Sequence, residues 1–420
     1  MTRHPSRTTT RHPSRRTTRR RLLATGAATL AAVGVAGCAD DADGDDDGAT
    51  NGDDASGGNG EEPASDDVLP DLPRVENPPD AVYIPTHREA MDHLPTEHAG
   101  DYAVTPMITY PHRFWLVTGD RAEEVLPESP RGVHLMFTPW DPETDTVLPV
   151  DTGAQMRVRH DGEVIDRRAP WPMISQSMGF HFGDNVPLPE DGTYTVEVDL
   201  NPMTTRRTGA FDGRFEEGGT ASFEFEYDDE FRRSLIDEVH YFDEELWGEH
   251  GAIEPMDHGH DHDDGHGHDD DHDHDDGDHD DDHDHGDHGM TMPFSSVPEA
   301  DAYPGLALGE PSTGDARIVG RYLPESRLAG GDGYLLVSPR TPYNRVPLAD
   351  TALSVDGAVS TRLEQTLDDE LGLHYGAPAS LDAGDVIEVV VEGPPQVARH
   401  AGYETAFLEM PPVELPVPEE

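Results

Sequence analysis

Short runs in which apolar and polar residues alternate recur along this chain, and they constrain its fold more than any other feature. Residues 222–227 alternate cleanly, and residues 155–159, 193–198 and 386–391 follow similar patterns. Alternation with a period of two places one side of a strand in a core and the other side in solvent. Pro, Gly and Asp separate the runs, as is typical of β-sandwiches. The sequence therefore predicts an all-β protein.

Two stretches of this kind resemble each other. Residues 134–139, His-Leu-Met-Phe-Thr-Pro, parallel residues 334–339, Tyr-Leu-Leu-Val-Ser-Pro. Residues 179–183, Gly-Phe-His-Phe-Gly, parallel residues 372–376, Gly-Leu-His-Tyr-Gly. Matching order and spacing indicate an internal duplication. Two copies of one sandwich are expected to pack as a pseudo-dimer within the chain, and a dimer of chains is the alternative.

The segment between the two stretches is expected to be helical from Asp229 to Glu249. Its apolar residues recur every three or four positions, at Phe231, Leu235 and Leu246 among others. This spacing is typical of an amphipathic helix packed on a sandwich. The predicted segments are a signal segment (1–38), a disordered acidic tether (39–73), a metal-binding sandwich (74–228), a helical connector (229–256), a disordered His/Asp-rich loop (257–289) and a second, degenerate sandwich (290–420).

The N-terminal segment has the features of an export signal. Residues 18–23, Thr-Arg-Arg-Arg-Leu-Leu, are typical of a twin-arginine signal, and the apolar stretch 24–37 is too short to span a membrane. Cys38, the only cysteine, directly follows Val-Ala-Gly, which is typical of a lipidation site. We expect a protein attached through lipid at Cys38 to the outer face of the cell membrane. The alternative is an unprocessed Cys38 within a membrane-anchoring helix.

Acidic residues dominate the composition. There are 87 Asp and Glu against 29 basic residues, all of them Arg, and the formal net charge is -58. Acid spread over every segment indicates a protein adapted to very high salt, where screening removes most self-repulsion. Nucleic-acid binding is excluded, because it depends on basic groups that meet phosphates.

Residues 257–289 consist almost wholly of His, Asp and Gly. Imidazole and carboxylate both bind divalent metals, so this loop is expected to capture ions at several weak, interchangeable sites. A low-complexity spacer is the alternative. The eleven histidines of the loop are His258, His260, His262, His266, His268, His272, His274, His279, His283, His285 and His288.

A resemblance to a known family rests on three neighbouring motifs. Trp-Pro-Met at 171–173 precedes Phe-His-Phe-Gly at 180–183, and Gly-Thr-Tyr-Thr-Val-Glu-Val follows at 192–198. Together they resemble the periplasmic high-affinity iron-transport lipoprotein family. The resemblance implies immunoglobulin-like sandwiches that bind copper, iron or zinc through His and Met side chains. It also implies a role in iron uptake alongside a membrane transporter.

The resemblance implies a ligand set in the first sandwich. Met173, His181 and His134 match three ligands of the family, while Met136 stands where the family has an acidic residue. A further family histidine falls near Arg207, which cannot bind a metal. The first sandwich therefore has at most three family ligands, with Met136 as a candidate fourth.

The second sandwich keeps another part of the set. His374 and His400 match family histidines, whereas Tyr334 and Thr366 replace the early His and the Met. We hypothesise that His400 or His374 completes the first site across the pseudo-dimer interface. Four upstream histidines are either extra ligands or ordinary surface residues, and we expect the latter: His87, His93, His98 and His112.

Thioether and imidazole donors suit a soft or borderline ion, so the expected cofactor is copper or iron, with zinc as a weaker fit. The alternative is that Met173 fills a core gap and that His181 is a satisfied buried histidine. We expect a metal-binding lipoprotein that assists iron uptake and is not an enzyme, since nucleophile motifs and phosphate loops are lacking. The other functions considered are copper or zinc sequestration, a redox role, and a structural surface module.

Overall fold

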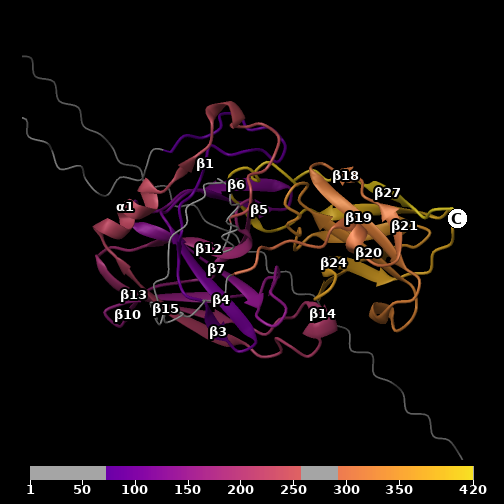
Figure 1. The fold of residues 1–420 in the computed structure, drawn as a ribbon, viewed down its shortest axis with the longest axis horizontal. Coiled ribbons are helices and arrows are strands. Elements are labelled where there is room, and N and C mark those ends of the chain that lie inside the picture. Colours follow the sequence, from indigo (N-terminus) through magenta and orange to yellow (C-terminus); the bar gives the residue numbers. More distant parts are fainter. Residues whose placement is uncertain (1–71, 257–291, 420) are drawn as a thin grey trace, which may run out of the picture. The chain divides into compact units, whose positions relative to one another are not determined.

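The computed structural model describes residues 72–256 and 292–419 (Figure 1). Over these residues the protein is nearly all β, built from several sheets, which confirms the predicted fold class. No helix in this part of the chain is long and apolar enough to cross a membrane. The predicted signal segment and His/Asp-rich loop lie outside the described residues, as does the predicted tether apart from residues 72 and 73.

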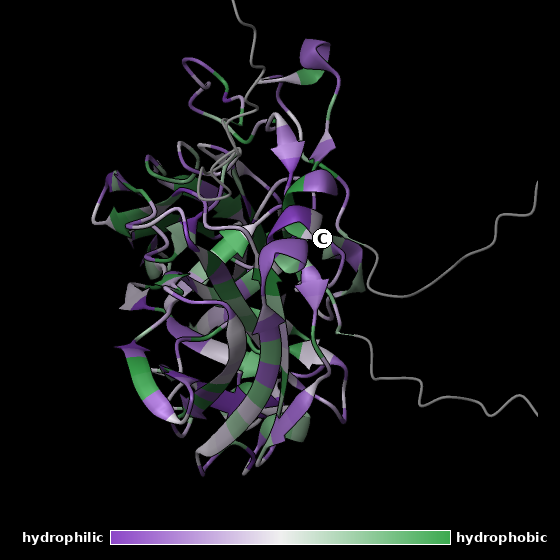
Figure 2. Ribbon diagram, turned by 90° about the vertical axis from the view of Figure 1, so that its left-hand side faces the viewer, coloured by the Kyte–Doolittle hydropathy of each residue, from purple (hydrophilic) through white to green (hydrophobic). Residues whose placement is uncertain are grey.

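The first half contains a four-stranded sheet that buries one face. Its burial pattern follows the sequence: Phe223, Phe225 and Tyr227 are buried, while Glu224 and Glu226 are exposed. Figure 2 shows the resulting hydrophobic and hydrophilic bands along the strands. The strand order is β10 (Glu163–Arg168), β9 (Gln155–His160), β13 (Gly192–Leu200) and β15 (Gly219–Tyr227).

A ten-stranded sheet supplies the other layer of the first half. Its central strands β4 and β7 are buried along their whole length, because residues pack on both of their faces. The order is β2 (Asp92–His93), β4 (Tyr102–Thr109), β7 (Gly132–Asp141), β12 (Gly179–Pro187), β11 (Trp171–Ser175), β26 (Ala398–Arg399), β5 (Phe114–Thr118) and β6 (Arg121–Val125), with β3 (Glu97–Ala99) beside β4 and β8 (Thr146–Val147) beside β7.

The second half repeats this two-sheet arrangement. The larger sheet has the order β14 (Arg206–Thr208), β23 (Glu364–Asp368), β24 (Gly372–Pro378), β20 (Tyr334–Arg340), β19 (Ala316–Leu323) and β17 (Leu306–Gly309), with β18 (Ser312–Thr313) beside β19. The smaller sheet has the order β22 (Thr361–Arg362), β21 (Ala352–Gly357), β25 (Val386–Gly393) and β27 (Val413–Pro416).

Each half lends a short strand to the other half's larger sheet. Strand β26 of the second half pairs in parallel with β11 of the first, with Ala398 opposite Met173. Strand β14 of the first half pairs in parallel with β23 of the second, with Arg206 opposite Thr366. Both exchanges occur at equivalent positions, because Met173 lies opposite His181 just as Thr366 lies opposite His374. The exchange carries His400, the residue after β26, to the first half.

The predicted helical connector is shorter than expected. Helix α1 spans Asp229–Asp237 and begins where the Asp228 carboxylate accepts a hydrogen bond from the N–H of Phe231 at 2.8 Å. The prediction of helix to Glu249 was wrong beyond Asp237. Strand β16 (His240–Tyr241) instead pairs with β1 (His87–Arg88), and only the short 3-10 turn η2 (Glu244–Leu246) follows. Pairing with a distant strand overrides the local periodicity here.

Candidate metal centre

One face of the large sheet gathers the ligands predicted in the first half. Met173 lies directly opposite His181, and Met136 lies opposite Gly183. Residues opposite each other in an antiparallel pair share a face, as do residues two apart on one strand. His134, two residues before Met136, therefore belongs to the same face. The four candidate side chains surround Gly183, which carries none.

Gly183 leaves the space into which the ligands point. A Cβ atom at this position would lie 2.9 Å from Nε2 of His134, 3.0 Å from Cγ of Met136 and 3.1 Å from Sδ of Met173. Nitrogen and sulfur donors thus converge on the point where a side chain is missing. A metal site in this sheet requires space between the ligand atoms, and the missing side chain of Gly183 provides it.

Two of the histidines are oriented by hydrogen bonds from Nδ1. Nδ1 of His134 lies 3.1 Å from Oδ1 of Asn185, and Nδ1 of His181 lies 3.1 Å from the carbonyl oxygen of Gly179. Both oxygens only accept, so each Nδ1 carries the proton and each Nε2 keeps a free lone pair. This is the usual way in which a protein prepares imidazole to bind a metal.

His400 joins the cluster from the second half. Its Nε2 atom lies 3.0 Å from Nε2 of His181, and its ring centroid lies 5.6 Å from that of His134. Since Nε2 of His181 is an acceptor, Nε2 of His400 carries the hydrogen in this contact. A neutral imidazole has one lone pair, so for an ion to bind between the two nitrogens this hydrogen would have to move to Nδ1 of His400. Of the two histidines proposed to complete the first site, the structure places His400 there.

Two further residues lie beside this cluster, and sequence reasoning assigned neither of them to it. The ring of His112 lies 4.2 Å from that of His134, centroid to centroid, which favours the alternative that His112 is an extra ligand. The potential ligand atoms of Glu89, His112 and His400 all lie within 4.8 Å of one another. Glu89 comes from the segment between β1 and β2 and adds a carboxylate. Only the fold brings this segment to the sheet, so no local pattern marks it.

Burial keeps the cluster in its metal-binding form. Burial, reinforced by the neighbouring histidines, lowers the pKa of His134 and of His400 well below the ordinary value of 6.5, and burial lowers the pKa of His181 to about 4. The neutral imidazoles that a metal requires are therefore present at physiological pH. Nε2 of His134 and of His112 are buried and have no hydrogen-bond partner among the described residues. Buried polar atoms of this kind usually have a partner, and a metal ion would supply it.

The donor set narrows the kind of ion. Three or four imidazoles, one or two thioethers and one carboxylate suit copper or ferrous iron, while thioether sulfur is an unusual ligand for zinc. The residues present therefore fit a transition-metal ion. Glu89, His112 and His400, whose ligand atoms lie within 4.8 Å of one another, would hold it together with the adjoining His134, His181 and Met173.

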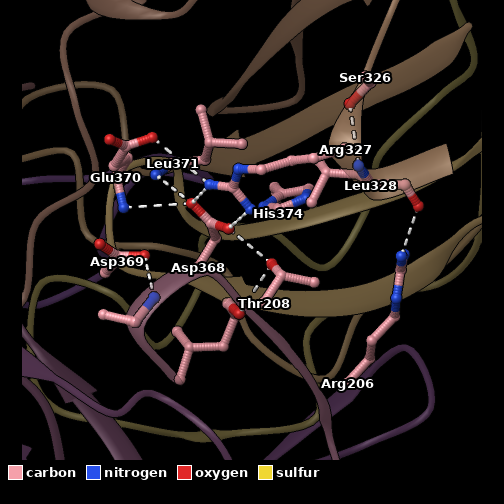
Figure 3. Close-up of polar contacts among 12 residues, drawn as sticks. Arg206, Thr208, Ser326, Arg327, Leu328, Asp368, Asp369, Glu370, Leu371 and His374 are labelled. Atoms are coloured by element: carbon pink, nitrogen blue, oxygen red, sulfur yellow. Dashed lines mark hydrogen bonds and ion pairs between the residues drawn. The ribbon is translucent and has the colours of Figure 1, made fainter. Parts of the chain in front are cut away.

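The second half has no matching centre among its described residues, although His374 was a predicted ligand. Nδ1 of His374 lies 3.1 Å from the Gly372 carbonyl oxygen, as in His181, but Nε2 lies 3.4 Å from the Tyr334 hydroxyl. Figure 3 shows what surrounds it: Arg327 binds the buried Asp368 carboxylate through two bonds of 2.7 and 2.9 Å. Thr208, which stands where the first half has His400, donates to the same carboxylate at 2.6 Å. Protein groups satisfy one another in this half, and His374 does not reach the cluster.

The eleven predicted loop ligands and the lipidation residue Cys38 lie outside the described residues.

Comparisons with known proteins add the following. Residues 301–416 match the model of a family described as a domain of unknown function (DUF7350). No curated protein matches this chain. Among solved structures, a copper-bound variant of FetP from uropathogenic Escherichia coli strain F11 is similar over 33% of this chain and 97% of its own. The identity is 19% and the TM-score is 0.25. The metal centre therefore rests on the residues described above.

Substituting Gly183 by alanine is expected to weaken metal binding by about 10- to 100-fold, comparable to losing an outer-shell partner of a ligand. The added methyl group would press on His134 Nε2 and Met173 Sδ without removing a ligand. Competition against a chromophoric copper chelator measures the change. Gly393→Ala is the matched control, because its Cβ meets only Ala352 at an ordinary 3.6 Å. Equal affinities in the two variants would contradict the placement of the ion beside Gly183.

Proposed function

We propose that this protein binds a transition-metal ion, copper or iron, at this centre and assists iron uptake outside the cytoplasm without being an enzyme. Two observations carry the proposal: His134 Nε2 and Met173 Sδ meet at the space left by Gly183, and His181 Nε2 lies 3.0 Å from His400 Nε2 on the same face of the sheet. Three imidazoles that burial keeps neutral, next to a thioether, are typical of a site that binds a metal ion.

The cellular setting of the proposal comes from the sequence. A twin-arginine signal and lipid attachment at Cys38 would place the centre at the outer face of the membrane. A membrane iron transporter is the partner that this function would require. Attachment of both proteins to one membrane raises the local concentration of the metal donor around the transporter, which favours delivery of the ion.

We further propose that the His/Asp-rich loop collects ions for the centre. The described residues on either side of it support this. The N–H of Met256 donates to the Ser177 carbonyl oxygen at 2.9 Å, and Ser295 packs against Gly179, whose carbonyl accepts from His181. Both flanks of the loop therefore contact the turn between β11 and β12. Those two strands carry Met173 and His181.

The test is metal titration of the exported chain, residues 39–420, with and without residues 257–289, in high salt. Mass spectrometry under non-denaturing conditions counts the ions. We expect the loop-deleted chain to keep one tightly bound copper or iron ion and to lose the additional, weaker ones. His181→Ala in the loop-deleted chain is expected to remove that ion, whereas His98→Ala, on the exposed strand β3, is expected to retain it.

Loss of all binding on loop deletion would refute a specific site in the sandwich. The chain would then be a surface module with a metal-capturing loop. Retention of the ion in His181→Ala would place the tight site elsewhere in the described residues.

A further inference from the structure

A cavity opens beside the metal centre, and the proposed function does not require it. Its volume is about 690 Å³, and Glu89 and His112 form part of its wall. A metal ion with six waters occupies far less, about 180 Å³ at roughly 30 Å³ per water. Cavities of several hundred Å³ are those that hold organic molecules. The size of the cavity therefore points to a ligand larger than a hydrated ion.

Much of the wall is apolar or aromatic. Tyr83, Tyr110 and Trp115 supply rings, and Leu126 and Leu408 supply aliphatic surface. Leu126 is 59% exposed, so its apolar surface is open to a ligand in the cavity. A ligand with an aromatic or aliphatic body would cover this surface.

Two arginines give one part of the wall a positive charge. Arg74 and Arg113 share a single carboxylate oxygen, Oε1 of Glu124, at 3.9 and 3.8 Å. Both distances are longer than a hydrogen bond, so the guanidinium groups have N–H donors to offer a ligand. Glu404 also lines the cavity, but its carboxylate already accepts from the Tyr83 hydroxyl and from the N–H of Gly402. Asp80, Glu89, Glu124 and Glu404 also line the cavity, so Arg74 and Arg113 are the cationic part of an otherwise acidic wall and the place where an anionic group of a ligand would bind.

Two polar atoms of the wall lack a partner. The hydroxyl of Tyr110 and Nε2 of His112 are buried and make no hydrogen bond within the described part of the chain. Tyr110 is only 3% exposed, so water does not freely satisfy its hydroxyl. A ligand oxygen beside Tyr110 would accept this hydrogen bond. His112 lies between such a ligand and the histidine cluster.

We propose that this cavity binds an organic carboxylate chelator with an aromatic or aliphatic body, so that the ion reaches the centre as a chelate. The inference rests on the proposed metal-binding function. The chelator's carboxylate would accept from Arg113 and Arg74, and its body would pack on Trp115 and Leu126. The metal it carries would then lie toward Glu89 and His112. From there it is within reach of His400.

Salicylate, an aromatic hydroxycarboxylate that chelates copper, is the probe. The full exported chain, loaded with one equivalent of Cu(II), is titrated with salicylate in a calorimeter, and the copper spectrum is followed in parallel. We expect one equivalent of salicylate to bind and to change the copper spectrum. Arg113→Gln is expected to weaken salicylate at least about tenfold, the value of a charged hydrogen bond, while copper affinity changes less than about twofold.

Arg121→Gln is the matched control, since Arg121 lies nearby on β6 but is exposed and does not line the cavity. Copper binding without salicylate binding, or equal effects of the two arginine variants, would overturn the chelate while leaving the proposed function intact. Salicylate binding only after deletion of residues 39–67 would also overturn it, by identifying the acidic tether as the occupant. Failure to bind either copper or iron would remove both proposals.

Discussion

Replacing His400 by alanine is expected to weaken metal binding in the first half at least about 100-fold, although His400 belongs to the second half. Even outer-shell partners of a metal ligand are worth about 10- to 100-fold, and His400 supplies a nitrogen of the cluster itself. Its Nε2 atom lies 3.0 Å from that of His181, a separation at which one ion contacts both after a small adjustment. Competition against a copper chelator of known affinity, in high salt, gives the ratio of dissociation constants.

His374→Gln is the discriminating control for this experiment. His374 occupies the position in the second half that His181 occupies in the first, but its Nε2 atom faces the Tyr334 hydroxyl. We expect this variant to bind copper within about twofold of the unaltered chain, as expected for a residue remote from the site. An equal loss of copper affinity in His374→Gln and His400→Ala would mean that both histidines contribute to binding, which contradicts the geometry described here.

The sandwich class could be predicted because it depends on a local signal. In β15, alternate side chains at Phe223, Phe225 and Tyr227 meet the core, and the residues between them meet solvent. A period of two is visible in any six-residue window, so the strands could be identified without knowledge of their partners. Met173 and His181 could be proposed as ligands from the family resemblance alone, and the structure adds that a hairpin places them opposite each other.

The remaining ligands depend on pairings that no local pattern encodes. Strand β26 consists of two residues, Ala398 and Arg399, and its parallel pairing with β11 joins segments more than 200 positions apart in the sequence. Arg207 looked like a lost ligand because the turn was assigned to its own sandwich. In the structure, β14 crosses to the second half, and His400 makes the reciprocal crossing. His112 and Glu89 were missed for the same reason.

The two halves show how structurally equivalent positions can have opposite roles. In the first half, a Cβ added at Gly183 would meet Nε2 of His134, Cγ of Met136 and Sδ of Met173. At the matching Gly376 of the second half, an added Cβ would meet the Tyr334 ring instead. Nearby, the Arg327 guanidinium neutralises the Asp368 carboxylate, and the Thr208 hydroxyl donates a hydrogen bond to it. Protein side chains therefore satisfy this region of the second half without an ion. A metal centre of this kind therefore needs the ligands of only one half together with one histidine from the other half.

Acid is expected to destabilise the metal-free protein well above the pH at which carboxylates are protonated. Burial is the main cause that lowers the pKa of all four histidines in the two matched regions: His134, His181, His374 and His400. The value falls to about 4 for His181 and for His374. The unfolded chain binds these protons near pH 6.5 and the folded chain does not, so falling pH favours unfolding. The stability is complete above about pH 6.5 and is lost as the pH falls from there toward the folded values.

The expected loss is about 3 to 5 kcal/mol in the free energy of unfolding between about pH 7.5 and 5.5, at up to about 1.4 kcal/mol per pH unit for each histidine. Asp350 opposes the trend, because burial raises its pKa to about 6 and the folded state gains that proton first. Denaturant unfolding at constant high salt measures the difference. His374→Gln should flatten the profile by less than about a quarter, since it removes one of the four histidines and leaves the metal ligands in place, while the lowered pKa of His87 and of His93 adds to the remaining slope. A free energy of unfolding that stays level or rises on acidification would show that the histidines are protonated in the folded chain, and the cluster would then not be prepared to bind a cation.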